Sequence, residues 1–318
     1  MDTGVAIDLV AIGEVMLELS GGGKDAIGKQ LPLGVAGDTF NTVVYASRKG
    51  CKASYFTQLG DDVYSAQMLD FLTAEGIDVE HIARVPNRMP GLYMISNLPG
   101  GERIFSYWRD NSPAREMCST EASEQALRAA LAPTKMAYLS GISLGILSAQ
   151  GIETLFKVLA DFRTAGGKVV FDSNYRPRLW KTKENAQDVT LRALLLADMA
   201  LLTDEDEHML WGSNDMASLV DRYSAGNLTE LVLKRGAEDV LYSLRASAGE
   251  TFAAPVSIPV PKVHDVVDTT AAGDSFNGAY LATRVQGGSV EDSIRSGCAC
   301  AGLVIRHKGA ITPRDMPL

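Results

Sequence analysis

Short apolar runs alternate with longer amphipathic stretches through most of this 318-residue chain, and this alternation restricts the possible folds most strongly. Several of the short runs are continuously apolar, as strands are when both faces of a sheet are covered. Alternating strands and helices predict an α/β fold, with a mostly parallel central sheet flanked by helices and ligands bound at the carboxyl ends of the strands. The predicted strands are 9–12, 53–59, 136–139, 168–171, 200–202, 231–234 and 240–244. The predicted helices are 39–49, 65–75, 121–131, 152–164, 185–196, 216–225, 273–283 and 290–305.

Two regions interrupt the alternation and predict a small β-sheet lid over the carboxyl ends of the strands. One is glycine-rich with short extended pieces, and the other is typical of a hairpin with the turn Pro99-Gly100-Gly101. Length alone allows one large domain or two. We expect a single domain over 1–318, with the lid formed by about 14–37 and 90–110.

Charge and composition exclude several classes of function. A formal net charge of −9 argues against nucleic acid as a partner. No apolar run approaches the roughly 18 residues that a membrane-spanning helix needs, and residues 1–8 lack the basic and apolar regions of a signal peptide. The cysteines have neither C-x-x-C nor zinc spacing, so we expect buried or idle thiols in a reducing compartment and a cytoplasmic protein. They are Cys51, Cys118, Cys298 and Cys300.

The stretch Asp268-Thr-Thr-Ala-Ala-Gly-Asp274 carries the clearest chemistry. The small residues Ala271, Ala272 and Gly273 lead into a predicted helix and let backbone N–H groups approach a ligand closely. The first N–H groups of a helix lack partners within it, and its dipole adds partial positive charge, which favours an anion such as phosphate. Asp274 adds a carboxylate that can accept the proton of an attacking hydroxyl, which indicates phosphoryl transfer. A capped helix with a favourable acid in its first turn is the alternative explanation.

A second glycine turn, Gly34-Val-Ala-Gly37-Asp38-Thr39-Phe40-Asn41, precedes another predicted helix. Asp38 accepts hydrogen bonds from hydroxyls, and Asn41 both accepts and donates them, so the pair suits a polyol. A glycine turn capped by Asp38 or Thr39 would explain the local structure without a ligand. We expect Gly37, Asp38 and Asn41 to contact a hydroxyl-rich substrate.

Both stretches resemble signatures of the PfkB (ribokinase-like) carbohydrate kinases, whose C-terminal motif is usually written D-T-x-G-A-G-D and whose N-terminal motif is G-G-x-x-x-N. They stand in the family's order, and the resemblance covers nearly the whole chain. It implies a ribokinase-like fold, ATP as phosphoryl donor, Mg²⁺, and a monovalent cation such as K⁺ near Asp268. Ala271 stands where the family usually has glycine, which keeps the N–H donor but limits the backbone to conformations that a Cβ tolerates.

The resemblance also implies roles for single residues. Asp274 would be the base, while N–H groups of 271–273 would stabilise charge on the transferred phosphoryl group. Thr203 and Asp206 occupy the positions of the family's N-x-x-E motif, so Asp206 would hold Mg²⁺ through water. The residues expected to bind the nucleotide are Asn174, Thr203, Lys234, Gly236 and Gly273.

Within the family the chain looks most like the kinases of 2-keto-3-deoxygluconate, a sugar acid. That likeness implies ATP-dependent phosphorylation of the terminal hydroxyl of 2-dehydro-3-deoxy-D-gluconate to the 6-phosphate. Tyr93, Tyr107, Arg109 and Arg176 would converge if the lid closed, and arginine binds a carboxylate by two parallel hydrogen bonds. The stretches that carry the likeness are Gly13-Glu-Val-Met-Leu-Glu-Leu19, Gly91-Leu-Tyr93, Tyr107-Trp-Arg109, Leu139-Ser-Gly-Ile-Ser143, Asn174-Tyr-Arg-Pro-Arg-Leu-Trp180 and Asp268-Thr-Thr-Ala-Ala-Gly-Asp274.

Three alternatives remain open. A PfkB kinase for a neutral sugar, such as fructose or ribose, would not need the two arginines. A nucleotide-dependent dehydrogenase is disfavoured because the first predicted strand leads into Gly13-Glu14 without G-x-G-x-x-G. A non-catalytic sugar-binding relative is disfavoured by the presence of Asp274 beside the anion site.

Other candidate sites are weak. The string Gly21-Gly22-Gly23-Lys24 lacks the following Ser/Thr and the preceding strand of a Walker loop, so we interpret it as a flexible turn of the lid. The four histidines are scattered, and we predict neither a histidine base nor a direct metal site. The open edges of a β lid favour pairing into a homodimer.

Overall fold

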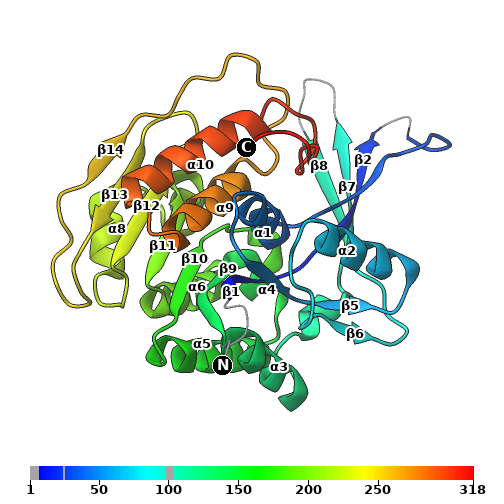
Figure 1. Cartoon of the computed structure of the whole chain (residues 1–318), viewed down its shortest axis with the longest axis horizontal. Helices are drawn as coiled ribbons and strands as arrows, with labels where there is room; N and C mark the ends of the chain where they lie inside the picture. The colour runs from blue at the N-terminus through cyan, green and yellow to red at the C-terminus, as the bar shows by residue number, and fades with distance from the viewer. Residues whose placement is uncertain (1–6, 24–25, 98–102) are drawn as a thin grey trace.

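A computed structural model describes residues 7–23, 26–97 and 103–318 and confirms the α/β class. Its large sheet consists of β1 (Ile7–Ile12), β4 (Ala53–Phe56), β9 (Thr134–Ser140), β10 (Lys168–Asp172), β11 (Met199–Thr203), β12 (Glu230–Lys234), β13 (Val240–Leu244) and β14 (Val256–Ile258). The strand order is β14-β13-β12-β11-β10-β9-β1-β4 (Figure 1). From β12 to β4 all neighbours are parallel, while β13 and β14 form an antiparallel edge. The carboxyl ends of six strands therefore meet at one edge of the sheet.

Helices cover both faces of this sheet because its central strands are apolar on both sides (Figure 1). In β1, Leu9 and Ala11 belong to one core and Val10 and Ile12 to the other, and all four are fully buried. The first core is covered by α1 (Asp38–Arg48), α2 (Val63–Ala74), α9 (Ala272–Val285) and α10 (Val290–Val304). The second core is covered by α3 (Glu121–Leu131), α5 (Ala149–Thr164), α6 (Lys183–Leu196) and α8 (Met216–Tyr223).

The segments predicted to form a lid build a separate small sheet. It consists of β2 (Met16–Gly22), β3 (Leu33–Ala36), β7 (Leu92–Asn97) and β8 (Arg103–Trp108), in the order β3-β2-β7-β8. Figure 1 shows it standing beside the large sheet, next to α1 and α2. The register places Glu18, Tyr93 and Tyr107 side by side across three strands, so these side chains share one face. The predicted turn at Pro99-Gly100-Gly101, the Lys24 end of the glycine string and residues 1–6 lie outside the described residues.

Several short elements differ from the prediction. The strand predicted over 53–59 is interrupted at Thr57, and its second half, β5 (Gln58–Gly60), pairs with β6 (Ala83–Val85). Two short helices, α4 (Gly141–Ile146) and α7 (Asp204–Trp211), follow strands directly. The Ser140 hydroxyl caps α4, and acidic side chains in the first turn of α7 complement its dipole. Two single turns of 3₁₀ helix complete the elements, at Pro113–Glu116 and Pro177–Leu179.

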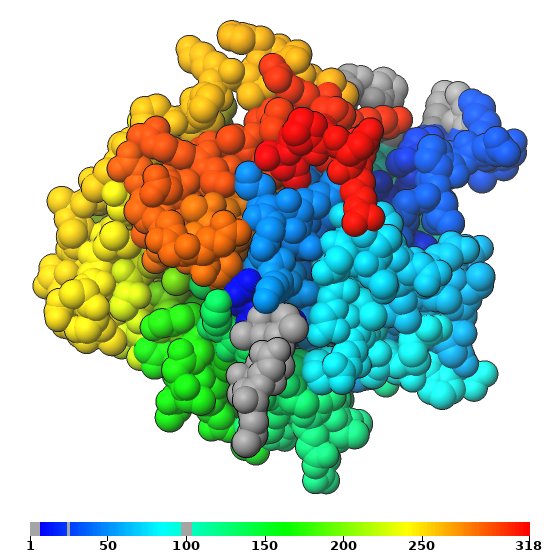
Figure 2. All heavy atoms as spheres, in the orientation of Figure 1, coloured from blue at the N-terminus to red at the C-terminus, as the bar shows by residue number. Residues whose placement is uncertain are grey.

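The segment after α10 packs over α1 and reaches the small sheet (Figure 2). The Tyr45 hydroxyl donates to the Ala310 carbonyl at 2.7 Å, and Arg48 donates to the Thr312 carbonyl at 2.9 Å. Ala310 also packs in one cluster with Tyr93 of the small sheet and with Ala271. The chain terminus thus joins the small sheet to the start of α9.

One expectation from composition agrees with the structure. The four cysteines are free and buried, which confirms the prediction of buried thiols. Over residues 7–23, 26–97 and 103–318, no helix is both long and apolar enough to traverse a bilayer.

Candidate active site

A cavity of about 1350 Å³ lies at the carboxyl ends of the parallel strands and is lined in part by the small sheet. Strands β10, β11 and β12 contribute their last residues, Asp172, Thr203 and Lys234, and the start of α9 forms another wall. Every candidate residue from the sequence lines this cavity. They are Gly37, Asp38, Asn41, Tyr93, Tyr107, Arg109, Asn174, Arg176, Thr203, Asp206, Lys234, Gly236, Ala271, Ala272, Gly273 and Asp274.

The start of α9 lies at the cavity, where the sequence predicted an anion site, and the Ala272 N–H differs from the expected donors. The Ala272 N–H donates to the Thr269 carbonyl at 3.2 Å, so this amide is already engaged in a turn. The first hydrogen bond of the helix runs from the Ser275 N–H to the Ala271 carbonyl at 2.8 Å. Gly273 and Asp274 precede it, and their N–H groups are of the kind that a helix leaves for a ligand.

Ala271 adopts the left-handed conformation that glycine usually takes, with φ 61° and ψ 17°. A residue with a Cβ reaches this region at a cost of roughly 1–2 kcal/mol. The Ala271 methyl packs in the cluster that contains Met16 and Tyr93, and this contact offsets part of the cost. The loop therefore keeps a glycine-like backbone although glycine is absent from the position.

Asp274 lines the cavity one residue beyond the glycine. The Asn41 amide donates to the Asp274 carboxylate at 2.7 Å. Burial, and next the charge of the nearby Asp38, raise the pKa of Asp274 to about 8. Asp38 itself accepts hydrogen bonds from Ser140 and, at 2.9 Å, from Asn174, and burial raises its pKa as well. A carboxylate whose pKa lies near the working pH suits a general base.

The two arginines expected at a substrate carboxylate already contact acids. Arg109 is 7% exposed and donates to Glu14, which is 1% exposed. Glu14 Oε1 and Arg109 Nε have no hydrogen-bond partner among the described residues, so part of each group is left for a ligand. Arg176 is half exposed and lies 3.3 Å from an Asp206 oxygen. Glu14 was not assigned from the sequence, although the motif Gly13-Glu14 directly follows β1.

The aromatic candidates form a wall of the cavity. The Tyr93 and Tyr107 ring centroids are 5.8 Å apart, and the Arg109 guanidinium lies 5.8 Å from the Tyr107 ring centroid. The Tyr93 hydroxyl donates to Glu18. Tyr107 keeps 43% of its surface exposed, so its hydroxyl is the more available of the two for a substrate.

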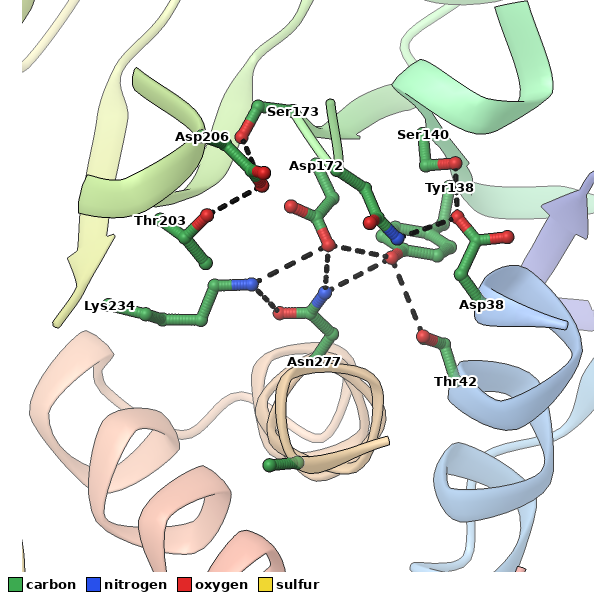
Figure 3. A network of polar contacts seen from close by, with 12 residues as sticks. Asp38, Thr42, Tyr138, Ser140, Asp172, Ser173, Thr203, Asp206, Lys234 and Asn277 are labelled. Atoms are coloured by element: carbon green, nitrogen blue, oxygen red, sulfur yellow. Dashed lines mark hydrogen bonds and ion pairs between the residues drawn. The ribbon is translucent and has the colours of Figure 1, made fainter. Parts of the chain in front are cut away.

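Two residues expected at the nucleotide have other contacts. The Asn174 amide binds Asp38, on the side of the proposed base. Lys234 donates to the side-chain oxygen of Asn277 at 2.9 Å and lies 3.5 Å from Asp172, beside α9 (Figure 3). Neither Asp172 nor Asn277 was among the residues predicted from the sequence. Their signals were an acid at the end of a parallel strand and an amide three residues after Asp274, on the same helix face.

The acidic residues fit a hydrated cation rather than a metal held by the protein alone. Within the described ranges, no group of three or more acidic, His or Cys side chains is placed so that it could hold a metal ion. Asp206 accepts from Thr203 at 2.6 Å, and burial raises its pKa. Asp172 Oδ1 lacks a hydrogen-bond partner among the described residues. Mg²⁺ usually keeps several waters and binds through one or two carboxylates together with substrate phosphates, which agrees with this donor set.

A helix start of small residues beside a buried carboxylate, at the carboxyl edge of a parallel sheet, is the arrangement expected of a ribokinase-like α/β kinase. A family model described as "pfkB family carbohydrate kinase" matches residues 6–317. The chain belongs to this family of carbohydrate kinases.

Relatives and solved structures agree with this membership. The 2-dehydro-3-deoxygluconokinase of Escherichia coli (strain K12) is 43% identical over 311 residues, covering 96% of this chain and 97% of that protein. A fructokinase of Vibrio alginolyticus is 25% identical and covers 86% of this chain and 85% of its own length. The fold is similar to the crystal structure of a fructokinase with bound ATP from Xylella fastidiosa, with a TM-score of 0.83 and 22% identity, covering 96% of this chain and 94% of that one.

Proposed function

We propose that this chain transfers the terminal phosphate of ATP to the terminal hydroxyl of 2-dehydro-3-deoxy-D-gluconate, giving the 6-phosphate. The observation that carries the proposal is one cavity that combines the α9 anion site and Asp274 with Arg109, Tyr93 and Tyr107 of the small sheet and its flank. The name of the E. coli relative, at 43% identity over nearly the full length, supports the same substrate.

Different residues of the cavity have different roles in the transfer of the phosphoryl group. Asp274 accepts the proton of the terminal hydroxyl, while the hydroxyl oxygen bonds to the γ-phosphorus and the bond to the β–γ bridging oxygen breaks. The N–H groups of Gly273 and Asp274 bind oxygens of the transferred group. Mg²⁺, held through water at Asp206, would neutralise charge on the polyphosphate. The small sheet acts as a lid within one ribokinase-like domain and excludes water, which limits wasteful hydrolysis of ATP.

The ion pairs in the cavity give the neutral-sugar alternative a specific basis. Because Arg109 contacts Glu14 and Arg176 contacts Asp206, neither arginine presents a full unpaired charge. A neutral sugar such as fructose would meet no unpaired arginine, whereas a sugar acid must share Arg109 with Glu14. The unpartnered Nε of Arg109 supports the acid, because it leaves an N–H donor for a carboxylate.

Substitution of the Arg109–Glu14 pair tests the choice between the two substrates. Arg109→Ala alone would leave Glu14 buried without a cation, at a cost of about 3–5 kcal/mol of stability. The double variant Glu14→Gln/Arg109→Met removes both charges together. We expect it to raise KM for the sugar acid by roughly 10- to 100-fold, since a hydrogen bond to a charged group contributes about 1.5–3 kcal/mol. KM for ATP should change little.

The matched control is Glu14→Gln, which keeps the arginine. It should retain the preference for the acid over a neutral sugar of equal length, and the double variant should lose it. KM for both sugars, measured for all three proteins, decides the matter. An equal rise for acid and neutral sugar in the double variant would mean that Arg109 supports the cavity wall and does not recognise charge.

Three further proposals complete the account. Exposed apolar side chains on the small sheet, among them Leu33, Ile104 and Trp108, support a homodimer through this sheet. The mass of the purified protein in solution tests it, and a monomer would contradict it.

A reaction that consumes ATP supports a cytoplasmic location. A monovalent cation near Asp268 is tested by the dependence of the rate on K⁺, and equal rates with and without K⁺ would contradict it.

A further inference from the structure

Behind the anion site, a buried network of five side chains fixes the ammonium group of Lys234 (Figure 3). Asn277 accepts from Lys234 at 2.9 Å, and its amide donates to Asp172 at 2.7 Å and to the Tyr138 hydroxyl at 3.1 Å. Thr42 donates to Tyr138 at 3.4 Å. The five residues come from β12, α9, β10, β9 and α1, so three strands of the sheet and two covering helices set the position of the ammonium.

The ammonium lies beside the start of α9. Lys234 is 7% exposed and lines the cavity. A methyl group added at Gly273 would lie 3.9 Å from Lys234 Nζ. Asn277 is three residues beyond Asp274 and four beyond Gly273, so the three residues share one helix face. The network therefore holds a positive charge next to the two N–H groups that form the anion site.

The pairing of this lysine is incomplete. The Lys234 Nζ and Asp172 Oδ2 atoms are 3.5 Å apart, longer than the roughly 2.7–2.9 Å of a strong ammonium–carboxylate hydrogen bond. The side-chain oxygen of Asn277 accepts a short hydrogen bond from one of the three N–H groups of the ammonium. Asp172 Oδ1 also has no hydrogen-bond partner among the described residues. A lysine with a purely structural role would make a closer pair, because a buried charge is costly unless it is fully bonded.

We propose that Lys234 is a catalytic residue that binds the phosphoryl group in transfer, and that Asp172 and Asn277 are the residues that position it. This inference rests on the proposed kinase function. As the bond to the β–γ bridging oxygen breaks, that oxygen leaves on ADP with the electron pair. Lys234 neutralises the charge that builds on the phosphate oxygens and keeps its own protons, while the proton of the sugar hydroxyl goes to Asp274. A fixed donor aimed at developing charge needs no reorganisation during the reaction.

The first test is Lys234→Met, which keeps the length of the side chain and removes its charge. We expect kcat to fall by roughly 10²–10³, as for other single donors to developing charge, with KM for ATP nearly unchanged. Because the single variant leaves Asp172 without its cation, Asp172→Asn/Lys234→Met is made alongside it as a charge-balanced form. The double variant should fold at least as stably as Lys234→Met and show the same low kcat.

The second test separates positioning from direct catalysis. Asp172→Asn and Asn277→Ala should each lower kcat about tenfold when Lys234 is present, and should lower it no further in the Lys234→Met background. The same factor in both backgrounds would show that these residues act independently of the lysine. A rise in KM for ATP with kcat unchanged in Lys234→Met would overturn the proposal in favour of ground-state nucleotide binding.

A readout that needs no sugar distinguishes failure of this inference from failure of the proposed function. ADP with aluminium fluoride mimics the phosphoryl group in transfer. Lys234→Met should weaken binding of this mimic by at least tenfold while its affinity for ATP stays within about threefold of wild type. Equal affinity of wild type and Lys234→Met for the mimic would overturn the catalytic role of Lys234. If wild type binds the mimic as expected but phosphorylates no sugar acid, only the proposed substrate fails.

Discussion

Asp274→Asn is expected to lower kcat by roughly 10²–10⁴, the usual contribution of a general base, while the fold and the affinity for ATP are retained. Asparagine has nearly the same shape and can keep a hydrogen bond to Asn41, which now binds the carboxylate at 2.7 Å. It cannot accept the proton of the sugar hydroxyl. The measurement is kcat and KM for both substrates with circular dichroism as the check on folding, and near-normal turnover in a folded variant would refute the assignment.

The raised pKa of Asp274 predicts how two quantities depend on pH: kcat/KM and the free energy of unfolding. Burial places the pKa at about 8, so kcat/KM of wild type should increase with pH up to about 8 and then level off. In the unfolded chain the group ionises near its ordinary value of 3.8. Between these values the folded state binds more protons, so the contribution of Asp274 to the free energy of unfolding decreases as pH rises from about 4 to about 8.

Asparagine cannot ionise, so the free energy of unfolding of the variant does not decrease for this reason as pH rises. At pH 7 to 8, Asp274→Asn should therefore raise the melting temperature while it lowers kcat, a combination typical of residues whose environment serves function rather than stability. Thermal melts of both proteins at pH 5 and pH 8 measure it. The difference in melting temperature between the variant and wild type should be larger at pH 8. A variant that is less stable than wild type at pH 8 would contradict the claim that the ionised Asp274 carboxylate destabilises the fold.

Gly273→Val is expected to abolish transfer and leave binding of the sugar acid intact. Gly273 has φ outside the left-handed region, and the nearest atom to an added Cβ would be Lys234 Nζ at 3.9 Å, so the variant should fold. The branched side chain would nevertheless occupy the space where phosphate oxygens approach the N–H groups. We expect kcat to fall by at least roughly 10²-fold, the effect of losing a single donor to developing charge.

Gly273→Ala is the matched control for this variant. It adds one methyl group and should lower kcat less than Gly273→Val does. The rate should therefore be highest with glycine, lower with alanine and lowest with valine. Calorimetric titration with the sugar acid alone should give similar affinities for all three proteins. An unchanged kcat in Gly273→Val would mean that the start of α9 is an ordinary capped helix and not a phosphate site.

Periodicity and local motifs predicted most of the fold. The apolar runs located β1 and β9 to β13 because strands buried on both faces have a strong signal, and the same regularity located the long helices. The strand predicted over 53–59 is interrupted at Thr57 in the structure. The helices α4 and α7 were not predicted, because helices of six and eight residues are too short to show an amphipathic period. Turn chemistry at Gly37 and Gly273 identified two walls of the cavity.

The pairing of side chains inside the cavity could not be predicted. Arg109 meets Glu14 across 95 residues, Asn174 meets Asp38 across 136, and Lys234 meets Asn277 across 43. Local sequence assigns each of these residues a charge or an amide, but partner choice depends on the register of distant strands. The sequence predicted that Arg109 binds a substrate carboxylate and that Lys234 binds the nucleotide. Their contacts with Glu14 and Asn277 could not be predicted.

The most direct test of the account is the substrate preference of the wild-type protein. The measurement is kcat/KM with ATP and Mg²⁺ for 2-dehydro-3-deoxy-D-gluconate, fructose and ribose, with the position of the new phosphate in the product determined by NMR. We predict that the sugar acid is preferred by at least about tenfold, the value of 1.4 kcal/mol from its carboxylate, and that phosphate is found on the terminal oxygen. Higher kcat/KM for fructose or ribose would contradict the account and make the protein a kinase of neutral sugars.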